Sequence, residues 1–260
     1  MPDQRYFVEL AYDGSPFHGW QIQPNAATVQ EELEKALGLL LRHPAPVTGC
    51  GRTDTGVHAK QYFAHFNSPN SIDTEKLVFK LNRLLPPGIG IMRIDPVAES
   101  AHARFNAEHR TYRYFIHYQK NPFRREHSWH LYGKRLDLGF MNRMCEILIE
   151  TEDFAAFAKT GSDVTHTRCL VHSAAWYWDE DQTGIYFEIR ANRFLRNMVR
   201  AVVGTLVEAG EGKLSEEDFR NIIKSGNRSE AGTSAPAQGL FLWDIGYPEW
   251  IWERELNEGE

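Results

Sequence analysis

The sequence lacks the long apolar runs that a membrane-spanning helix requires. Runs such as Leu39 to Leu41 and Ala201 to Val203 fall far short of the roughly 18 apolar residues that cross a bilayer. The opening residues, MPDQRY, also lack the basic and apolar parts of a secretory signal. We therefore expect a cytoplasmic protein without a membrane segment.

Cysteine is scarce, and its spacing argues against two kinds of site. The three cysteines, Cys50, Cys145 and Cys169, lie far apart, form no C-x-x-C pair and have no nearby histidine at ligand spacing. An odd and scattered set also provides no disulfide framework. The sequence therefore predicts neither a metal site nor a disulfide.

A basic excess is missing overall, because the formal net charge is −6 at pH 7. Taken alone, this argues against a nucleic-acid partner. The charges are segregated, however. Residues 101–135 hold eight Lys or Arg against two Glu, residues 190–200 hold four Arg and no acid, and the last sixteen residues hold five Glu and one Arg. Basic stretches are usually solvated surface, but the aromatic residues between these keep nucleic-acid binding open.

The chain has 260 residues, of which 42% are hydrophobic and 25% charged, as in ordinary globular proteins. This length predicts two domains, which we place at residues 1–100 and 101–260. In the first, the patterns predict strands at 5–12, 46–50, 60–66 and 89–97 and helices at 28–41 and 74–84. A Thr28/Glu31 capping box marks the start of the first helix.

The second half repeats this order of elements more loosely. The patterns predict strands at 111–118, 169–178, 184–191 and 240–247, helices at 136–150 and 193–209, and an additional helix at 215–225. Both halves therefore have the order βαββαβ. We predict an α+β protein made of two ferredoxin-like halves, whose antiparallel sheets form a central cleft.

The loop from Gly49 to Ala59 is the most unusual segment. Its glycines leave the backbone open to close approach, and it presents Asp54 two residues after Arg52. Such a carboxylate is a candidate nucleophile, and the alternative is an Asx-turn, in which it bonds only the amides of its own turn. Asp54-Thr55-Gly56 also matches the aspartic protease tripeptide, but that chemistry needs two carboxylates sharing a proton, and no second D-T-G or D-S-G occurs.

The predicted helix after Ala191 has basic residues beside an apolar face. At 100° per residue, Arg193, Arg196, Arg200 and Gly204 form a stripe that flanks Leu195, Met198, Val199, Val202 and Leu206. We expect Gly204 to leave room beside Arg200. A guanidinium among valines needs a carboxylate partner, because an unpaired buried charge is costly, and Asp54 is a candidate.

The predicted strand at 111–118 is rich in aromatic residues. Its alternation puts Tyr112 and Tyr114 on one face and Phe115 on the other. Aromatic residues in strands usually pack in the core, which is the expectation for Tyr114 and Phe115. Tyr112, at the start of the strand, could instead offer its ring as a stacking surface for a base.

Several blocks of the sequence together resemble the tRNA pseudouridine synthase A family. They are Tyr12 to Gly14 with Phe17 to Gln21, Gly51 to Ala59, His102 to Phe105 with Tyr112 to Tyr114, and Ala191 to Leu195 with Met198 to Arg200 and Val203-Gly204. The blocks occur in the family's order and spacing from about Tyr6 to Tyr247. The resemblance implies an enzyme that isomerises uridine to pseudouridine at positions 38, 39 and 40 of the tRNA anticodon arm, as a homodimer and without a cofactor.

The resemblance also implies roles for individual residues. By motif position, Asp54 is the catalytic aspartate, Arg200 its paired arginine and Tyr112 the tyrosine stacked on the target base. Arg52 helps to hold the place of the flipped-out nucleotide, and Leu240 lines the pocket. Residues Ala101, His102, Ala103, Arg104 and Phe105 and the loop from Gly161 to Thr165 resemble tRNA-contacting segments.

Two alternatives accompany this interpretation. One is a catalytically inactive tRNA-binding protein of the same fold, but binding alone has no need of a carboxylate facing a polyanion. The other is the hydrolytic aspartyl enzyme, against which the lack of a second D-T-G or D-S-G argues. As a separate point, His58 could act as an acid or base, although the resemblance gives it no such role. We therefore assign His58 to the structure of the loop.

Overall fold

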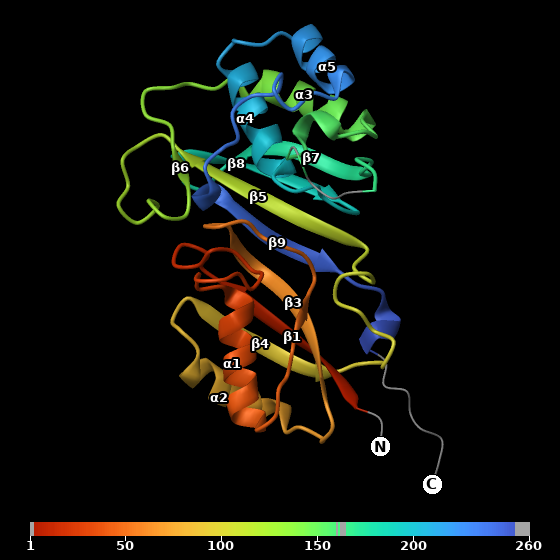
Figure 1. Ribbon diagram of the computed structural model, residues 1–260. Helices are drawn as coiled ribbons and strands as arrows, with labels where there is room; N and C mark the ends of the chain where they lie inside the picture. Colours follow the sequence, from red (N-terminus) through yellow and green to blue (C-terminus); the bar gives the residue numbers. More distant parts are fainter. Residues whose placement is uncertain (1–2, 160, 162–164, 253–260) are drawn as a thin grey trace. The chain divides into compact units, whose positions relative to one another are not determined.

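The computed structural model describes residues 3–159, 161 and 165–252 (Figure 1). The chain divides into two compact units. The first contains the residues up to Glu108 and those from Leu242 onward, and the second contains residues 109–241. The predicted domain boundary at residue 100 falls shortly before the observed one. The prediction also assigns the end of the chain to the second domain, whereas in the structure it belongs to the first unit.

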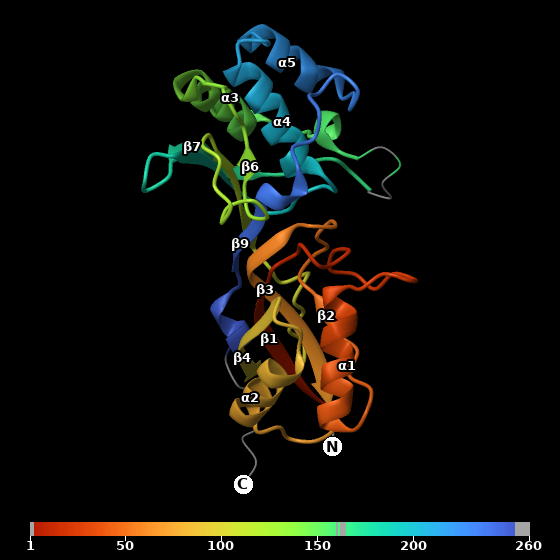
Figure 2. The same cartoon turned by 90° about the vertical axis from the view of Figure 1, so that its left-hand side faces the viewer.

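The first unit has the predicted βαββαβ order. Its elements are β1 (Gln4–Tyr12), α1 (Val29–Leu41), β2 (Thr48–Gly49), β3 (His58–Ser68), α2 (Thr74–Leu84) and β4 (Ile89–Pro96). Strand β1 lies between β3 and β4 and is antiparallel to both, and β2 is antiparallel to β3. Helices α1 and α2 contact each other and cover the sheet (Figure 2). Phe7 and Phe63 of the sheet pack against Trp252 of η3 (Glu249–Trp252).

Side-chain caps fix where the helices of the first unit begin. The Thr28 hydroxyl accepts a hydrogen bond from the Glu31 amide at 3.4 Å, as the capping box predicts. The Glu31 carboxylate does not complete the predicted capping box with the Thr28 amide and lies 2.8 Å from Lys35 Nζ instead. Asp73 caps α2 by accepting from the Lys76 amide at 3.1 Å. These caps are local signals, so the sequence places both helix starts correctly.

The second unit is also an antiparallel sheet covered by helices. Its elements are β5 (His109–His117), β6 (Trp129–His130), α3 (Leu138–Glu150), η1 (Ala155–Phe157), β7 (Val171–Trp178), β8 (Gly184–Ala191), α4 (Met198–Gly210), α5 (Glu216–Ser225) and η2 (Ala237–Gly239). Strand β8 is antiparallel to β5 and β7, and the short β6 is parallel to β5. Helices α3, α4 and α5 contact one another above this sheet (Figure 1). Strand β9 (Leu240–Gly246) leads back into the first unit. The α+β class is confirmed.

Helix α4 begins later than the sequence predicts. Its first residue is Met198, because Asn197 adopts the left-handed conformation with φ of 65° and donates from Nδ2 to Ser234 Oγ at 2.7 Å. Arg193 and Arg196 therefore precede the helix. The predicted helical stripe is wrong for these two arginines, and it is reduced to Arg200 and Gly204.

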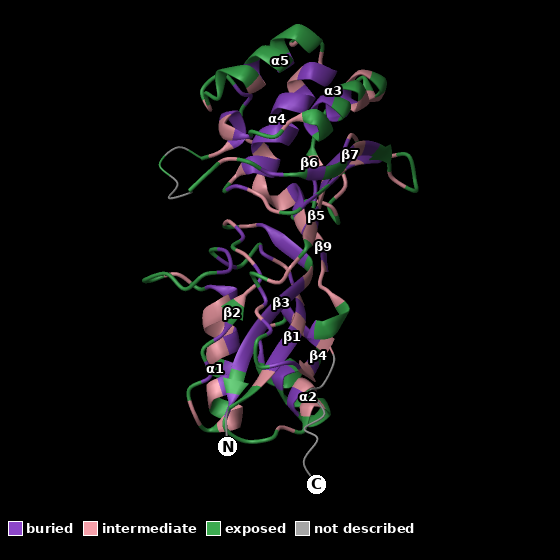
Figure 3. Cartoon of the chain, turned by 90° about the vertical axis from the view of Figure 1, so that its right-hand side faces the viewer, coloured by how far each residue is buried: buried purple, intermediate pink, exposed green. Residues whose placement is uncertain are grey.

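Burial along α4 is nearly complete (Figure 3). Only Arg200 and Glu208, its two charged residues, are partly exposed. The helix is the centre of the second unit's core, and it carries one of the predicted site residues. Among the helices in the described part of the chain, none has the length and apolar character needed to cross a membrane.

Candidate active site

The predicted site residues are divided between the two units. Asp54, Arg52 and residues 101–105 belong to the first unit, and Tyr112, Arg200 and Leu240 belong to the second. Each unit therefore carries one half of the predicted site. Residues 162–164 of the predicted tRNA-contacting loop and the acidic end of the chain from residue 253 lie outside the described residues.

The backbone of the Asp54 loop is held by hydrogen bonds at both ends. The Cys50 amide donates to the Phe63 carbonyl at 2.8 Å, and the Tyr62 hydroxyl donates to the Gly51 carbonyl. After Asp54, the Val57 amide donates to the Asp54 carbonyl at 3.1 Å, and this backbone hydrogen bond closes a turn over residues 54–57. The loop therefore presents Asp54 from a backbone with a defined path.

A second backbone segment, residues 13–20, packs directly on this loop. The Trp20 amide donates to the Thr53 carbonyl at 3.3 Å. A Cβ at Gly19, whose φ is +88°, would lie 2.4 Å from the Thr53 carbonyl oxygen, and a Cβ at Gly14 would lie 2.1 Å from that of Val57. Any side chain at these two positions would push the segments apart. Gly14 and Gly19 are therefore needed for the position of the loop.

Side chains of the same segment fix the loop further. The Tyr12 and Thr53 hydroxyls form a buried hydrogen bond of 2.9 Å. His58 is 1% exposed, and its Nδ1 accepts from the Gly14 amide at 3.0 Å and lies 3.1 Å from Asp13 Oδ1. These contacts agree with the structural role that the sequence assigns to His58.

Asp54 is partly buried, and the neighbouring Arg52 is exposed. The Gly56 amide donates to the Phe17 carbonyl at 3.4 Å and so ties the turn after Asp54 to residues 13–20.

Residues 101–105 form a tight turn built on histidine acceptors. His102 Nδ1 accepts from the amides of Arg104 and Phe105 at 3.2 Å each, and His65 Nδ1 accepts from the Ala103 amide at 3.1 Å. Arg5 Nη1 donates to the Ala101 carbonyl at 2.9 Å. Ala101 and Ala103 are buried, whereas Arg104 and Phe105 are exposed.

The acceptor role requires both histidines to be uncharged at Nδ1. Burial, with Arg5 and His102 nearby, lowers the pKa of His65 to about 4. Burial and Arg5 also lower the pKa of His102. Both rings are therefore neutral near pH 7, and they hold the turn that presents Arg104 and Phe105 to solvent.

Tyr112 and Tyr114 share a face of β5 but differ in their surroundings. Tyr114 is buried, its hydroxyl donates to the Pro236 carbonyl at 2.8 Å, and burial raises its pKa. Tyr112 is partly exposed, and its ring meets Phe194 edge to face at 4.9 Å. Tyr112 is therefore the more exposed ring of this pair.

Arg200 is bonded to Ala235 through both its backbone and its side chain. Its Nε donates to the Ala235 carbonyl at 2.7 Å, and its own carbonyl accepts from the Ala235 amide at 2.9 Å. The space predicted beside Gly204 is filled by backbone, since a Cβ there would lie 1.8 Å from the Thr233 carbonyl oxygen. The expected room is absent because residues 233–235 occupy it. Leu240 is buried at the start of β9.

The two basic stretches of the sequence meet within the second unit. Strands β5 and β8 pair so that Arg110 lies opposite Ala191 and Thr111 opposite Arg190. Arg110 Nη1 donates to the Asn192 carbonyl at 3.2 Å, and Arg190 Nη2 lies 2.9 Å from His109 Nδ1. Residues distant in the sequence thereby form one basic end of the sheet.

The structure adds residues that the sequence interpretation missed. Gly14 and Gly19 could have been found, because glycine beside a turn signals close backbone approach. Ala235, which accepts the hydrogen bond from Arg200, and Arg228, which donates to the neighbouring Ser234, carry no such local signal.

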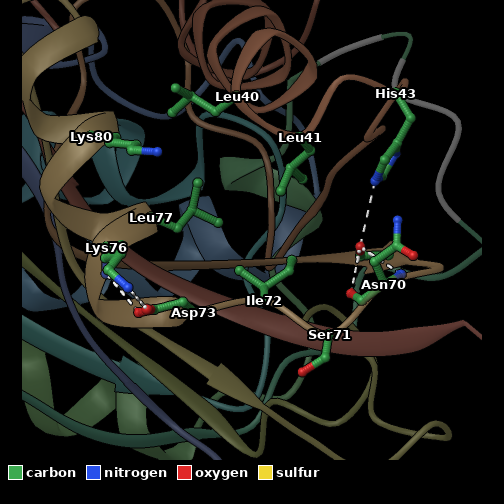
Figure 4. Close-up of a pocket in the computed structure, with 11 residues that line it drawn as sticks. Leu40, Leu41, His43, Asn70, Ser71, Ile72, Asp73, Lys76, Leu77 and Lys80 are labelled. Atoms are coloured by element: carbon green, nitrogen blue, oxygen red, sulfur yellow. Dashed lines mark hydrogen bonds and ion pairs between the residues drawn. The ribbon is translucent and has the colours of Figure 1, made fainter.

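A cavity and two buried cysteines lie apart from the predicted site residues. A cavity of about 280 Å³ lies between the end of α1, residues 68–73 and the start of α2, and none of the predicted site residues lines it (Figure 4). Its Lys76 is bonded to Asp73 at 2.6 Å.

Burial raises the pKa of Cys145 to about 12 and that of Cys169 to about 11, so both thiols stay protonated.

Comparison with known families agrees with the α+β fold. The family profile described as tRNA pseudouridine synthase matches residues 144–248. The chain is 50% identical over 257 residues to tRNA pseudouridine synthase A of Bacteroides thetaiotaomicron, covering 98% of this chain and 95% of that relative. The protein of that name from Bacillus subtilis is 38% identical over 242 residues, with coverages of 92% and 97%. The chain therefore belongs to the tRNA pseudouridine synthase A family.

Proposed function

We propose that this chain isomerises uridine to pseudouridine at positions 38, 39 and 40 of the tRNA anticodon arm. Family membership makes it an isomerase that acts on tRNA uridine. The three positions follow from the sequence resemblance. The observation that carries the proposal is the Asp54 loop, in which a partly buried carboxylate stands on a backbone fixed by Gly14 and Gly19.

The reaction requires one well-placed carboxylate. Converting an N-glycoside to a C-glycoside breaks the N1 to C1′ bond, turns the uracil while it stays bound and forms a C5 to C1′ bond. An ionised carboxylate can achieve this by attacking C1′, by adding to C6 or by acting as a base towards the sugar. Each route depends on precise placement, which the main-chain bonds of the Asp54 loop support.

The second unit supplies the supporting groups in this proposal. Arg200 pairs with Asp54, keeps it ionised and sets its direction. The ring of Tyr112 retains the detached base, and its hydroxyl assists removal of the C5 proton. Leu240 lines the pocket, and Arg52 helps to hold the place of the flipped-out nucleotide. Flipping is required because the atoms to be joined are inaccessible in a stacked helix.

The partner and assembly are also part of the proposal. The chain works without a cofactor in the cytoplasm, as a homodimer whose clefts receive the tRNA. Exposed Arg104 and Phe105 offer a charge for phosphate and a ring for stacking, which suits RNA contact. The basic end of β5 and β8 supports the same partner despite the net charge of −6.

Replacing Asp54 tests the proposal. We expect Asp54→Asn to abolish tritium release from tRNA labelled at uridine C5, because the reacting charge is removed. tRNA affinity should stay within a few fold, because the shape is nearly unchanged. Asp181→Asn, which changes an exposed carboxylate, is the matched control and should keep full turnover. Turnover by Asp54→Asn would contradict the assignment, and a wild-type chain that binds tRNA without tritium release would support the inactive binding protein.

A further inference from the structure

Residues 231–235, here called the strap, lie along α4 and are bonded to it at several points. The Gly232 amide donates to Thr205 Oγ1 at 2.9 Å, and the Thr233 amide donates to Glu208 Oε1 at 3.3 Å. Beside Gly204, the absence of a side chain lets the Thr233 carbonyl approach the helix. The strap ends at Ala235, the residue that holds Arg200.

Arg228 also binds the strap. Its Nη1 donates to the carbonyls of Ala231 and Gly232 at 3.3 and 3.1 Å, and its Nη2 donates to Ser234 Oγ at 2.7 Å. Ser234 Oγ also accepts from Asn197, the residue before α4. One guanidinium thus joins three acceptors of the strap, a geometry that the planar fork of arginine provides and a lysine ammonium does not.

The strap determines how Arg200 can meet a carboxylate. Its Nε–H is committed to the Ala235 carbonyl at 2.7 Å, so the plane of the guanidinium is fixed relative to the strap. A carboxylate partner is then met end-on by the two Nη groups. A shift of Ala235 would turn this fork away from its partner.

We propose that Arg228 is a positioning residue for the isomerisation, acting through the strap to orient the guanidinium of Arg200. The inference rests on the proposed function, because it assumes that Arg200 serves the reaction. Arg228 is only partly buried. Without it, the bonds of the strap to Thr205 and Glu208 and the packing at Gly204 remain. We therefore expect its loss to loosen Arg200 without unfolding the unit.

Arg228→Ala tests the inference against Arg220→Ala as the matched control. Arg220 lies on α5 and pairs with Glu216 at 2.9 Å, away from the strap. In steady-state tritium release, Arg228→Ala should lower kcat about 10- to 100-fold while KM for tRNA stays within about threefold, since small misplacements have effects of that size. Arg228→Lys should recover only part of the loss. Arg220→Ala should match wild type.

A double-mutant cycle separates positioning from a general structural role. Arg200→Lys has no Nε for Ala235 to hold, so adding Arg228→Ala to it should change kcat by less than about twofold. A further large fall in kcat in the Arg200→Lys background would overturn the inference. So would a rise in KM as large as the fall in kcat. Full activity of Arg228→Ala would overturn it while leaving the proposed function intact. An inactive wild-type chain would overturn both.

Discussion

The Asp54 loop and the Arg200 helix hold their functional residues by different means. The Asp54 loop is positioned by close backbone packing, where Gly14 and Gly19 admit the carbonyls of Val57 and Thr53. Arg200 is instead held through its own side chain, whose Nε is bonded to the Ala235 carbonyl. One unit fixes a carboxylate through the main chain, and the other fixes a guanidinium through the strap.

The difference predicts how sensitive the position of each functional residue is to mutation. Backbone packing at Gly14 fails with any added side chain, because the Val57 main chain on the other side cannot rotate away. The position of Arg200 depends on the hydrogen bond that its Nε donates to the Ala235 carbonyl and on those that Arg228 and Asn197 donate to Ser234, so it can be weakened in steps. We expect all-or-none effects in the first unit and graded effects in the second.

Substituting Arg200 should have the largest of the graded effects and sharpen that side of the comparison. If Arg200 pairs with Asp54 as proposed, removing one partner of the buried pair costs about 3 to 5 kcal/mol, which corresponds to a rate loss of about 150- to 5,000-fold for Arg200→Leu. Arg200→Lys keeps the charge but loses the bidentate fork, so its rate should be intermediate. Single-turnover rates and tRNA affinity measured together check this. Equal losses in affinity and rate would assign Arg200 to binding instead.

The same glycine substitution in each unit would test the all-or-none side. Gly14→Ala and Gly204→Ala each bring a Cβ against a carbonyl oxygen, at 2.1 and 1.8 Å, and should lower the free energy of unfolding by about 1 to 3 kcal/mol. Gly14→Ala should also abolish activity, whereas Gly204→Ala should reduce it by displacing the strap.

The control for these variants is Gly38→Ala in α1, where the nearest atom would be 3.7 Å away. Alanine suits a helix interior better than glycine, so this change should raise the free energy of unfolding by up to about 1 kcal/mol. Urea denaturation of the three variants measures the differences. A Gly14→Ala protein as stable and active as wild type would break the comparison.

The smallest effect concerns pH and the turn at residues 101–105. The folded-state pKa of His65, about 4, lies below its ordinary value of 6.5, because burial and Arg5 oppose the charged ring. Between these values the unfolded chain binds more protons, so the contribution of His65 is complete above pH 6.5 and is lost as pH falls towards 4. In His65→Phe, thermal unfolding should depend less steeply on pH across this window. Identical slopes in the two proteins would contradict the role of His65.

The fold was predictable where its signals are contiguous in the sequence. Asp73 caps α2 and proline follows it, and the observed helix spans the predicted residues 74–84. Strand β8 likewise matches its prediction at 184–191. The start of α4 was not predictable in this way, because Asn197 is held in its left-handed conformation by a bond to Ser234 far along the chain.

The candidate site shows the same limit. Asp54, Arg52 and the glycines around them lie within one loop, and their unusual composition marks the segment without any structure. The support of Arg200 is spread over Arg228, Ser234 and Ala235, which belong to a polar stretch with no periodicity. The expectation of open space beside Gly204 failed because the strap that fills it is brought there by folding.

The sequence by itself determined the α+β class, the order of elements and the loop that presents Asp54, because periodicity, helix caps and glycine-rich turns act between near neighbours. Tertiary packing alone brings the segment of Gly14 and Gly19 onto the Asp54 loop, fills the space beside Gly204 and places the strap that holds Arg200. These contacts join residues far apart in the chain. Their formation depends on how whole elements pack, which no local pattern records.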